Sequence, residues 1–140
     1  MQYYKLDDNG VPVECDDLIE WARWFETADR RVALTHVTPW IEVSTVFLGI
    51  DHRWIGDGPP ILYETMVFAP LPGRLTDQPV VTKRFGRGPP RPVYDQTLEE
   101  QHRYATLAEA RLGHARTVKR LRARVREIDK LQRARTAAHD

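Results

Sequence analysis

Four side chains have types and positions that could support acid–base chemistry: Asp51, His52, Glu64 and His114. Asp51 and His52 follow an apolar segment that we expect to be a central strand, and His114 lies on the apolar stripe of a helix. Glu64 shares a row with Leu62 and Met66 on the next predicted strand. In a water-poor pocket, carboxylates and imidazoles change their pKa values and can transfer protons or hold a divalent metal. One hypothesis is therefore a small hydrolase that uses these four residues, by acid–base catalysis or with a metal, on a phosphoester.

The same four residues also have a structural interpretation, which we favour. Asp51 and His52 would cap a turn, and Glu64 would meet a backbone or Arg partner at a sheet edge. His114 would donate one buried hydrogen bond. Structural pairs of this kind also perturb titration, so a polar residue on an apolar row does not by itself identify a catalytic group.

The rest of the sequence lacks the commonest enzyme motifs. It contains no phosphate-binding loop, no nucleophile elbow, no H-E-x-x-H helix and no C-x-x-C pair. Its single cysteine, Cys15, excludes an internal disulfide and a cysteine-based zinc site. We therefore predict no catalytic residues, no metal and no cofactor, and we favour a non-enzymatic protein.

The elements that must position these residues form an α+β pattern. Asp17 with Glu20 is a capping pair that predicts a helix over 17–27. Segments rich in β-branched and aromatic residues, separated by Pro and Gly, predict an antiparallel β-meander of 3–5 strands packed against this short helix and a long C-terminal one. The strands are expected over 31–37, 40–50 and 60–69, with a short hairpin from 1–5 and 11–13 around the Asn9-Gly10 step.

The C-terminal part predicts one long helix on a body formed by residues 1–110. Thr106 and Glu109 form a capping box, and apolar residues follow at 3- and 4-residue steps. A helix over 107–137, within a unit spanning 106–138, would be roughly 45 Å long, whereas the body would be about 35 Å across. We expect it to project and its apolar stripe to need a partner, which predicts a homo-oligomer. The predicted interface residues are Val118, Leu121, Val125 and Ile128.

Charge is distributed unevenly although the net charge is only +1. From Arg111 onward the chain has ten Lys or Arg residues against three Asp or Glu, whereas the residues before it have 11 against 17. The basic helix could neutralise phosphates of a nucleic acid. Its charges go round the helix without interleaved aromatic residues, so balancing an acidic body in the same or a neighbouring subunit is the alternative that we favour.

A proline-rich segment interrupts the chain at 70–98, where six of the ten prolines lie. Proline at this density predicts an arm or long loop with at most a short strand near 80–85. Its basic residues could contact another subunit, a host protein or a phosphate-bearing ligand. Trp54, in a Gly-rich loop, is expected to be exposed. The predicted ligand-binding residues are Arg53, Trp54, Arg84, Arg87 and Tyr104.

Three blocks of the sequence are similar to a family of small proteins encoded by tailed phages and prophages. They are the run Val43 to His52, the run Gly58 to Phe68, and Arg103-Tyr104-Ala105-Thr106 with Glu109-Ala110 and Gly113-His114. The resemblance implies an α+β fold and a phage or prophage accessory gene, and it transfers no catalytic role. The proline-rich segment and the extended final helix depart from the family pattern, in which a short Gly-rich turn joins the second and third blocks.

These observations leave three functional hypotheses. The first is a non-enzymatic phage accessory protein that binds a host protein or a small, nucleotide-like ligand, as a host-takeover or counter-defence factor would. The second is the hydrolase described above, and the third is a nucleic-acid-binding accessory protein. No segment approaches the ~18 apolar residues of a membrane span, and Met1–Cys15 lacks the features of a signal peptide, so we expect a cytoplasmic protein without membrane contact.

Overall fold

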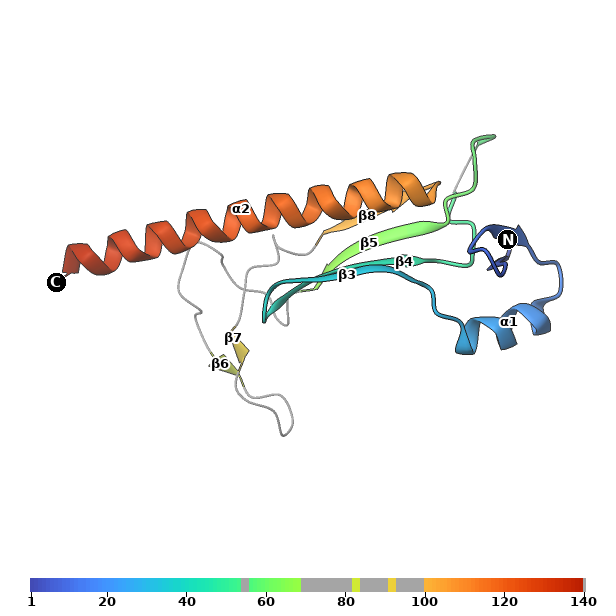
Figure 1. The fold of residues 1–140 in the computed structure, drawn as a ribbon, viewed down its shortest axis with the longest axis horizontal. Helices are drawn as coiled ribbons and strands as arrows, with labels where there is room; N and C mark the ends of the chain where they lie inside the picture. The colour runs from blue at the N-terminus through green and yellow to red at the C-terminus, as the bar shows by residue number, and fades with distance from the viewer. Residues whose placement is uncertain (54–55, 69–81, 84–90, 93–99, 140) are drawn as a thin grey trace.

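The chain forms a four-stranded antiparallel sheet with one long helix lying along one of its faces (Figure 1). The computed structural model describes residues 1–53, 56–68, 82–83, 91–92 and 100–139. The predicted α+β architecture is confirmed. The elements are β1 (Tyr4–Leu6), β2 (Pro12–Glu14), α1 (Leu18–Thr27), β3 (Arg31–Thr38), β4 (Ile41–Phe47), β5 (Tyr63–Phe68), β6 (Thr82–Lys83), β7 (Arg91–Pro92), β8 (Gln101–Tyr104) and α2 (Leu107–His139).

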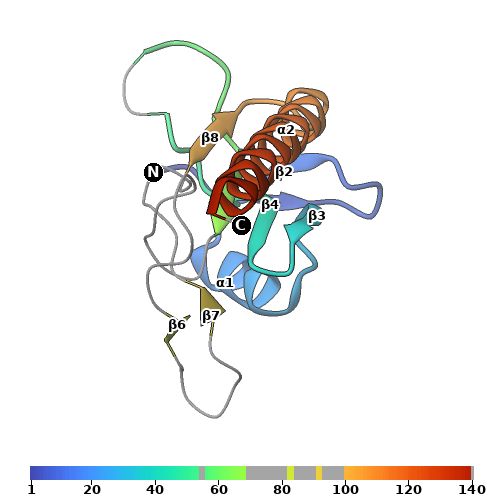
Figure 2. The same ribbon diagram turned by 90° about the vertical axis from the view of Figure 1, so that its left-hand side faces the viewer.

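The main sheet has the strand order β3-β4-β5-β8, and every neighbouring pair is antiparallel. The first three strands are the predicted meander, and β8 adds a fourth beside β5, with Glu64 opposite Arg103. Seen along the long axis, α2 lies over the sheet with β3 on one side and β8 on the other (Figure 2). The helix therefore has two flanks, each facing an edge strand.

The core forms where the period-2 pattern of β4 meets the helical stripe of α2. Ile41, Val43, Thr45 and Phe47 are buried on one face of β4, while the residues between them are half-buried. Alternation along the strand explains this pattern, because successive side chains point to opposite faces. The buried cluster under α2 contains Ile41, Val43, Val67, Val118, Leu121 and Ile128, with Val37 and Val125 packed against it.

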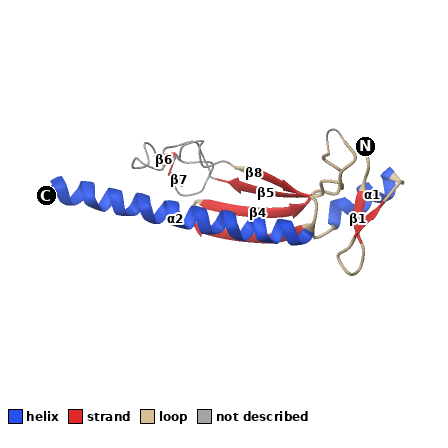
Figure 3. Cartoon of the chain, turned by 90° about the horizontal axis from the view of Figure 1, so that it is seen from above, coloured by secondary structure: helices blue, strands red, loops and turns tan. Residues whose placement is uncertain are grey.

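The subunit interface was predicted because the apolar stripe of the long helix was expected to face water, and this cluster shows that expectation to be wrong. Val118, Leu121 and Ile128 are only 7%, 3% and 5% exposed within a single chain. Their stripe does not face water, because it packs on the chain's own sheet. The C-terminal turns of α2 do continue beyond the strands (Figures 1 and 3), as the predicted helix length requires. A homo-oligomer remains a prediction, but the four residues predicted to form its interface pack within the single chain.

The predicted N-terminal helix begins where expected but is capped differently. The Asp17 carboxylate accepts hydrogen bonds from the backbone N–H groups of Ile19 and Glu20, at 2.9 and 3.1 Å. The reciprocal bond expected of Glu20 is replaced by an ion pair with Lys5 of the N-terminal hairpin. The indole of Trp21 donates to a carbonyl oxygen of that hairpin and to one of the loop after β4, so α1 is fixed to the end of the sheet.

Several predictions concern residues outside the described ranges. The residues concerned are Trp54, Arg84, Arg87 and most of the 70–98 segment. Within that segment, β6 falls inside the strand expected near 80–85, and its antiparallel partner β7 was not predicted. Among the described residues, no helix has the length and hydropathy of a membrane span.

Candidate anion-binding groove

His114, predicted to make one buried hydrogen bond, makes two. Its Nε2 lies 2.9 Å from the hydroxyl of Thr35, and its Nδ1 lies 2.8 Å from that of Thr45. The Thr45 hydroxyl also bonds that of Thr65 at 2.5 Å, deep in the core. A neutral imidazole donates with one nitrogen and accepts with the other, and threonine hydroxyls can do either, so the group is satisfied.

The charge state of His114 follows from its position between helix and sheet. Burial disfavours the protonated ring and lowers the pKa of His114 below its ordinary value of 6.5. The ring is therefore neutral near pH 7 and tied to two hydroxyls. This arrangement agrees with the structural interpretation of His114.

Glu64 lies on the opposite face of the sheet from His114. Its neighbour Thr65 points toward α2, and alternation along β5 directs Glu64 away from the helix. There its carboxylate accepts a hydrogen bond from Gln101 at 2.5 Å and forms an ion pair with Arg103 at 2.9 Å. The predicted Arg partner at a sheet edge is present, and the sheet separates Glu64 from His114.

Asp51 and the residues after it occupy a third place, the loop that follows β4. The Asp51 carboxylate accepts hydrogen bonds from the backbone N–H groups of Arg53 and Ile61, both at 2.9 Å, and pairs with the Arg53 guanidinium at 3.0 Å. Burial alone would raise the pKa of Asp51, but the Ile61 and Arg53 N–H groups and the Arg53 charge together hold this pKa below 3.8. Arg53, predicted to bind ligand, also donates to the Gly58 carbonyl. The Asp51 carboxylate and the Arg53 guanidinium therefore hold the loop together by bonds within it.

The four residues of the hydrolase hypothesis therefore do not form one pocket. Asp51 and His52 lie in the loop, while Glu64 and His114 lie on opposite faces of the sheet. Among the described residues, no group of three or more His, Cys, Asp or Glu side chains is arranged to hold a metal ion.

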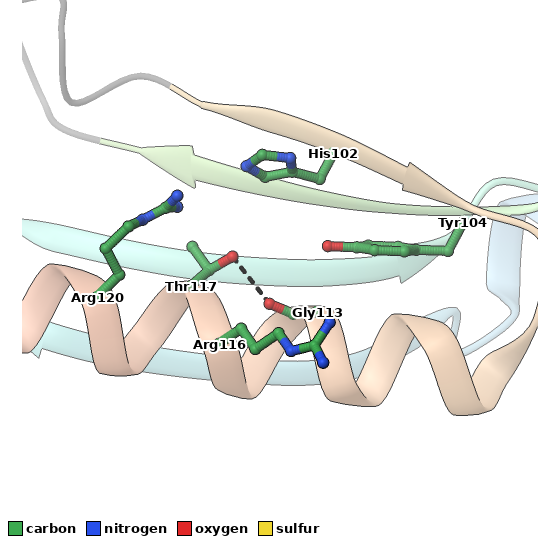
Figure 4. Close-up of a pocket in the computed structure, with 6 residues that line it drawn as sticks. All are labelled: His102, Tyr104, Gly113, Arg116, Thr117 and Arg120. Carbon is green, nitrogen blue, oxygen red and sulfur yellow. Dashed lines mark hydrogen bonds between the residues drawn. The ribbon is translucent and has the colours of Figure 1, made fainter.

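A different set of polar residues lines a groove between β8 and α2 (Figure 4). Because Gln101 and Arg103 point to the far face with Glu64, alternation directs His102 and Tyr104 toward the helix. Across from them, one flank of α2 presents residues at 3- and 4-residue steps. The groove has a volume of about 270 Å³ and is lined by His102, Tyr104, Gly113, Arg116, Thr117 and Arg120.

A carboxylate outside the lining residues, that of Glu100, contacts two of them. Figure 4 shows the heads of His102 and Arg120 at the same end of the groove. One oxygen of the Glu100 carboxylate lies 3.0 Å from His102 Nε2 and forms an ion pair with Arg120. Arg116 is exposed and has no ion pair with the described residues. Of its two guanidinium groups, that of Arg120 is paired with a carboxylate, and that of Arg116 has no such pair within the described part of the chain.

Tyr104 packs against the helix only because position 113 has no side chain. A Cβ atom placed on Gly113 would lie 2.0 Å from the Tyr104 hydroxyl oxygen and 2.2 Å from its Cζ. Thr117 donates to the Gly113 carbonyl at 2.8 Å, so its hydroxyl hydrogen is not available to a ligand. The Tyr104 hydroxyl has no hydrogen-bond partner among the described residues. It can therefore donate into the groove.

The sequence indicated only part of this site. Tyr104 was a predicted ligand-binding residue, and Arg116 and Arg120 were noted only as charges of the basic helix. His102 and Glu100 were missed. The alternation of the Gln101–Tyr104 strand was the available signal, but its use requires knowing that this strand pairs with β5.

Comparison of the chain with known protein families, with curated proteins and with solved structures found no match. The likeness to phage and prophage proteins therefore stays a resemblance of sequence blocks.

Proposed function

We propose that this protein is a non-enzymatic phage accessory protein that binds a small phosphate-bearing ligand in the groove between β8 and α2. The observation that carries the proposal is that Arg116, Arg120, His102 and Tyr104 line one groove. A phosphate would compete with the Glu100 carboxylate for Arg120 and His102.

Phosphate fits these donors better than a second carboxylate does. Guanidinium groups present N–H donors in a fixed fork that matches phosphate oxygens, and such charge-assisted bonds are stronger than neutral ones. A phosphate has enough oxygens to accept from more than one of these donors at once. The volume of about 270 Å³ lies just below the usual range for drug-sized ligands, roughly 300–1,000 Å³, which favours a phosphate monoester or a mononucleotide.

Binding without turnover is favoured by the chemistry of the lining residues. The Thr117 hydroxyl donates to the Gly113 carbonyl, and the His102 imidazole is already hydrogen-bonded to Glu100. The four acid–base candidates of the sequence lie elsewhere. With this function we expect a cytoplasmic location in the host. A homo-oligomer and a host-protein partner remain further predictions.

The experiment is isothermal titration calorimetry with inorganic phosphate, adenosine 5′-monophosphate and adenosine at low ionic strength. We expect both phosphate compounds to bind and adenosine not to bind. Arg116→Gln should weaken binding by about tenfold or more, since a hydrogen bond to a charged group contributes about 1.5–3 kcal/mol.

Arg124→Gln is the matched control, because Arg124 is also exposed on α2 but pairs with Glu127 and does not line the groove. It should change the dissociation constant less than twofold. Equal losses in the two variants, or no binding of phosphate by the wild type, would show that the groove is not the site.

A further inference from the structure

The other flank of α2 carries a straight row of basic residues beside β3. Starting at Arg111, steps of 4, 4, 3, 4, 4 and 3 residues lead along one side of the helix, and such steps place side chains on neighbouring turns of the same face. Only the second position, Ala115, lacks a charge. The basic row consists of Arg111, Lys119, Arg122, Arg126, Lys130 and Arg133.

All six side chains of the basic row are exposed. None of them forms an ion pair with the described residues, in contrast to Arg120 and Arg124 on the other side of the helix. At 1.5 Å per residue the row is about 33 Å long, close to one turn of duplex nucleic acid, about 34–36 Å. One acid, Asp129, lies beside the row, three residues after Arg126 and four before Arg133. The row therefore presents an excess of positive charge over about the length of one duplex turn.

The composition of the row distinguishes between classes of partner. Protein interfaces generally bury an apolar or aromatic centre, and the row has none; the exposed Leu112 and Leu131 of α2 are not members of it. Single-stranded nucleic acids are held by aromatic stacking, and the row has no aromatic residue. Duplex backbones require only positive charge at the phosphates.

Beside the middle of the row, the helix and β3 enclose a second groove of about 490 Å³. Lys119, Arg122 and Arg126 line it, together with the Thr35 side chain from the edge strand. A phosphate of a nucleic-acid backbone could enter this groove and lie among three consecutive members of the row.

We propose that the basic row binds the backbone of a nucleic-acid duplex without sequence preference. Arg116 and Arg120 line the groove beside β8 and are not members of the basic row, so this inference stands apart from the proposed function. Either can fail without the other.

The test measures fluorescence anisotropy of a labelled 24-base-pair duplex as a function of salt concentration. With four to six phosphate contacts, the logarithm of the association constant should fall with the logarithm of salt concentration at a slope of about −3.6 to −5.4. The doubly substituted Arg122→Gln/Arg126→Gln protein should have a slope shallower by about 1.8. Circular dichroism will verify that both exposed substitutions leave the fold intact.

The matched control is Arg23→Gln/Arg31→Gln, which removes two exposed charges from α1 and β3 instead. Its slope should stay within about 0.5 of the wild-type slope. The proposal is overturned if the duplex does not bind at 50 mM salt, or if the two double variants lose the same amount of affinity for it. It is also overturned if a polyglutamate peptide or the single strand competes as well as the unlabelled duplex.

Discussion

Replacing His114 by alanine tests whether its hydrogen bonds with the sheet under α2 stabilise the fold. The imidazole makes hydrogen bonds of 2.9 and 2.8 Å with Thr35 and Thr45 and is 7% exposed. Each net hydrogen bond contributes about 0.5–1.5 kcal/mol, and truncation of a buried ring adds the cost of a cavity. Thr45 keeps its bond to Thr65, which limits the loss. We expect His114→Ala to lower the free energy of unfolding by about 2–4 kcal/mol.

The pH dependence of the same variant gives a second readout. Because the pKa of His114 is below 6.5 in the folded protein, the unfolded chain binds a proton as pH falls through about 6.5 while the folded chain does not. Wild-type stability must therefore fall with pH from about 6.5 down to the folded pKa, and the variant must lack this component. Sign and window both follow from the direction of the shift.

Urea denaturation followed by circular dichroism at pH 5, 6, 7 and 8 measures both effects. His36→Ala serves as the control, since the side chain of His36 is 57% exposed and its only described partner is Glu42 at 3.4 Å. Removing it should change stability by less than about 0.5 kcal/mol. A stable His114→Ala protein, or a difference from wild type that does not change between pH 5 and 8, would refute the structural role.

Three further predictions concern the packing of single residues. Gly113→Ala should destabilise the wild type, since the new Cβ meets the Tyr104 hydroxyl at 2.0 Å, but should stabilise a Tyr104→Ala protein by about 0.5–1 kcal/mol through helix propensity; thermal melts of the two single variants and the double variant measure this change of sign. Asp51→Ala should cost about 1–3 kcal/mol through the lost bonds to Arg53 and Ile61. This difference should shrink as pH falls from about 3.9, where the unfolded carboxyl takes up a proton, towards the lower pKa of the folded protein. Gly49→Ala should cost about 1–3 kcal/mol in urea denaturation, because Gly49 has φ +75° and a Cβ there would lie 3.2 Å from Phe25.

Sequence periodicity was sufficient to predict the type and the buried side of the elements that have one buried face. Alternation in β4 and the 3- and 4-residue steps of α2 specify which side is buried, and the observed elements agree with the predicted ones. Boundaries shifted where single residues interrupt the ladder. The strand predicted over 40–50 ends at Phe47, just before Gly49 with its positive φ. The strand predicted from 60 begins at Tyr63, after Pro59 and Pro60, which cannot donate ladder hydrogen bonds.

The grooves depend on contacts that no local pattern contains. Apolar residues occur on both faces of β5, so the sequence could not decide whether Glu64 lies beside His114 or behind the sheet. The answer comes from the register of β8, which brings Arg103 opposite Glu64 and His102 toward α2. That pairing spans the proline-rich segment. The separation of basic residues into two flanks likewise requires knowing which side of α2 faces each edge strand.

The most direct test of phosphate binding in the groove removes the carboxylate that competes for it. Calorimetric titration with inorganic phosphate compares the wild type with Glu100→Gln and with Glu127→Gln, which removes an exposed carboxylate of α2 away from the groove. We expect Glu100→Gln to bind phosphate several-fold more tightly, because Arg120 and His102 become available, and Glu127→Gln to stay within twofold of the wild type. Unchanged or weaker binding by Glu100→Gln, or the same gain in both variants, would show that phosphate does not bind in this groove.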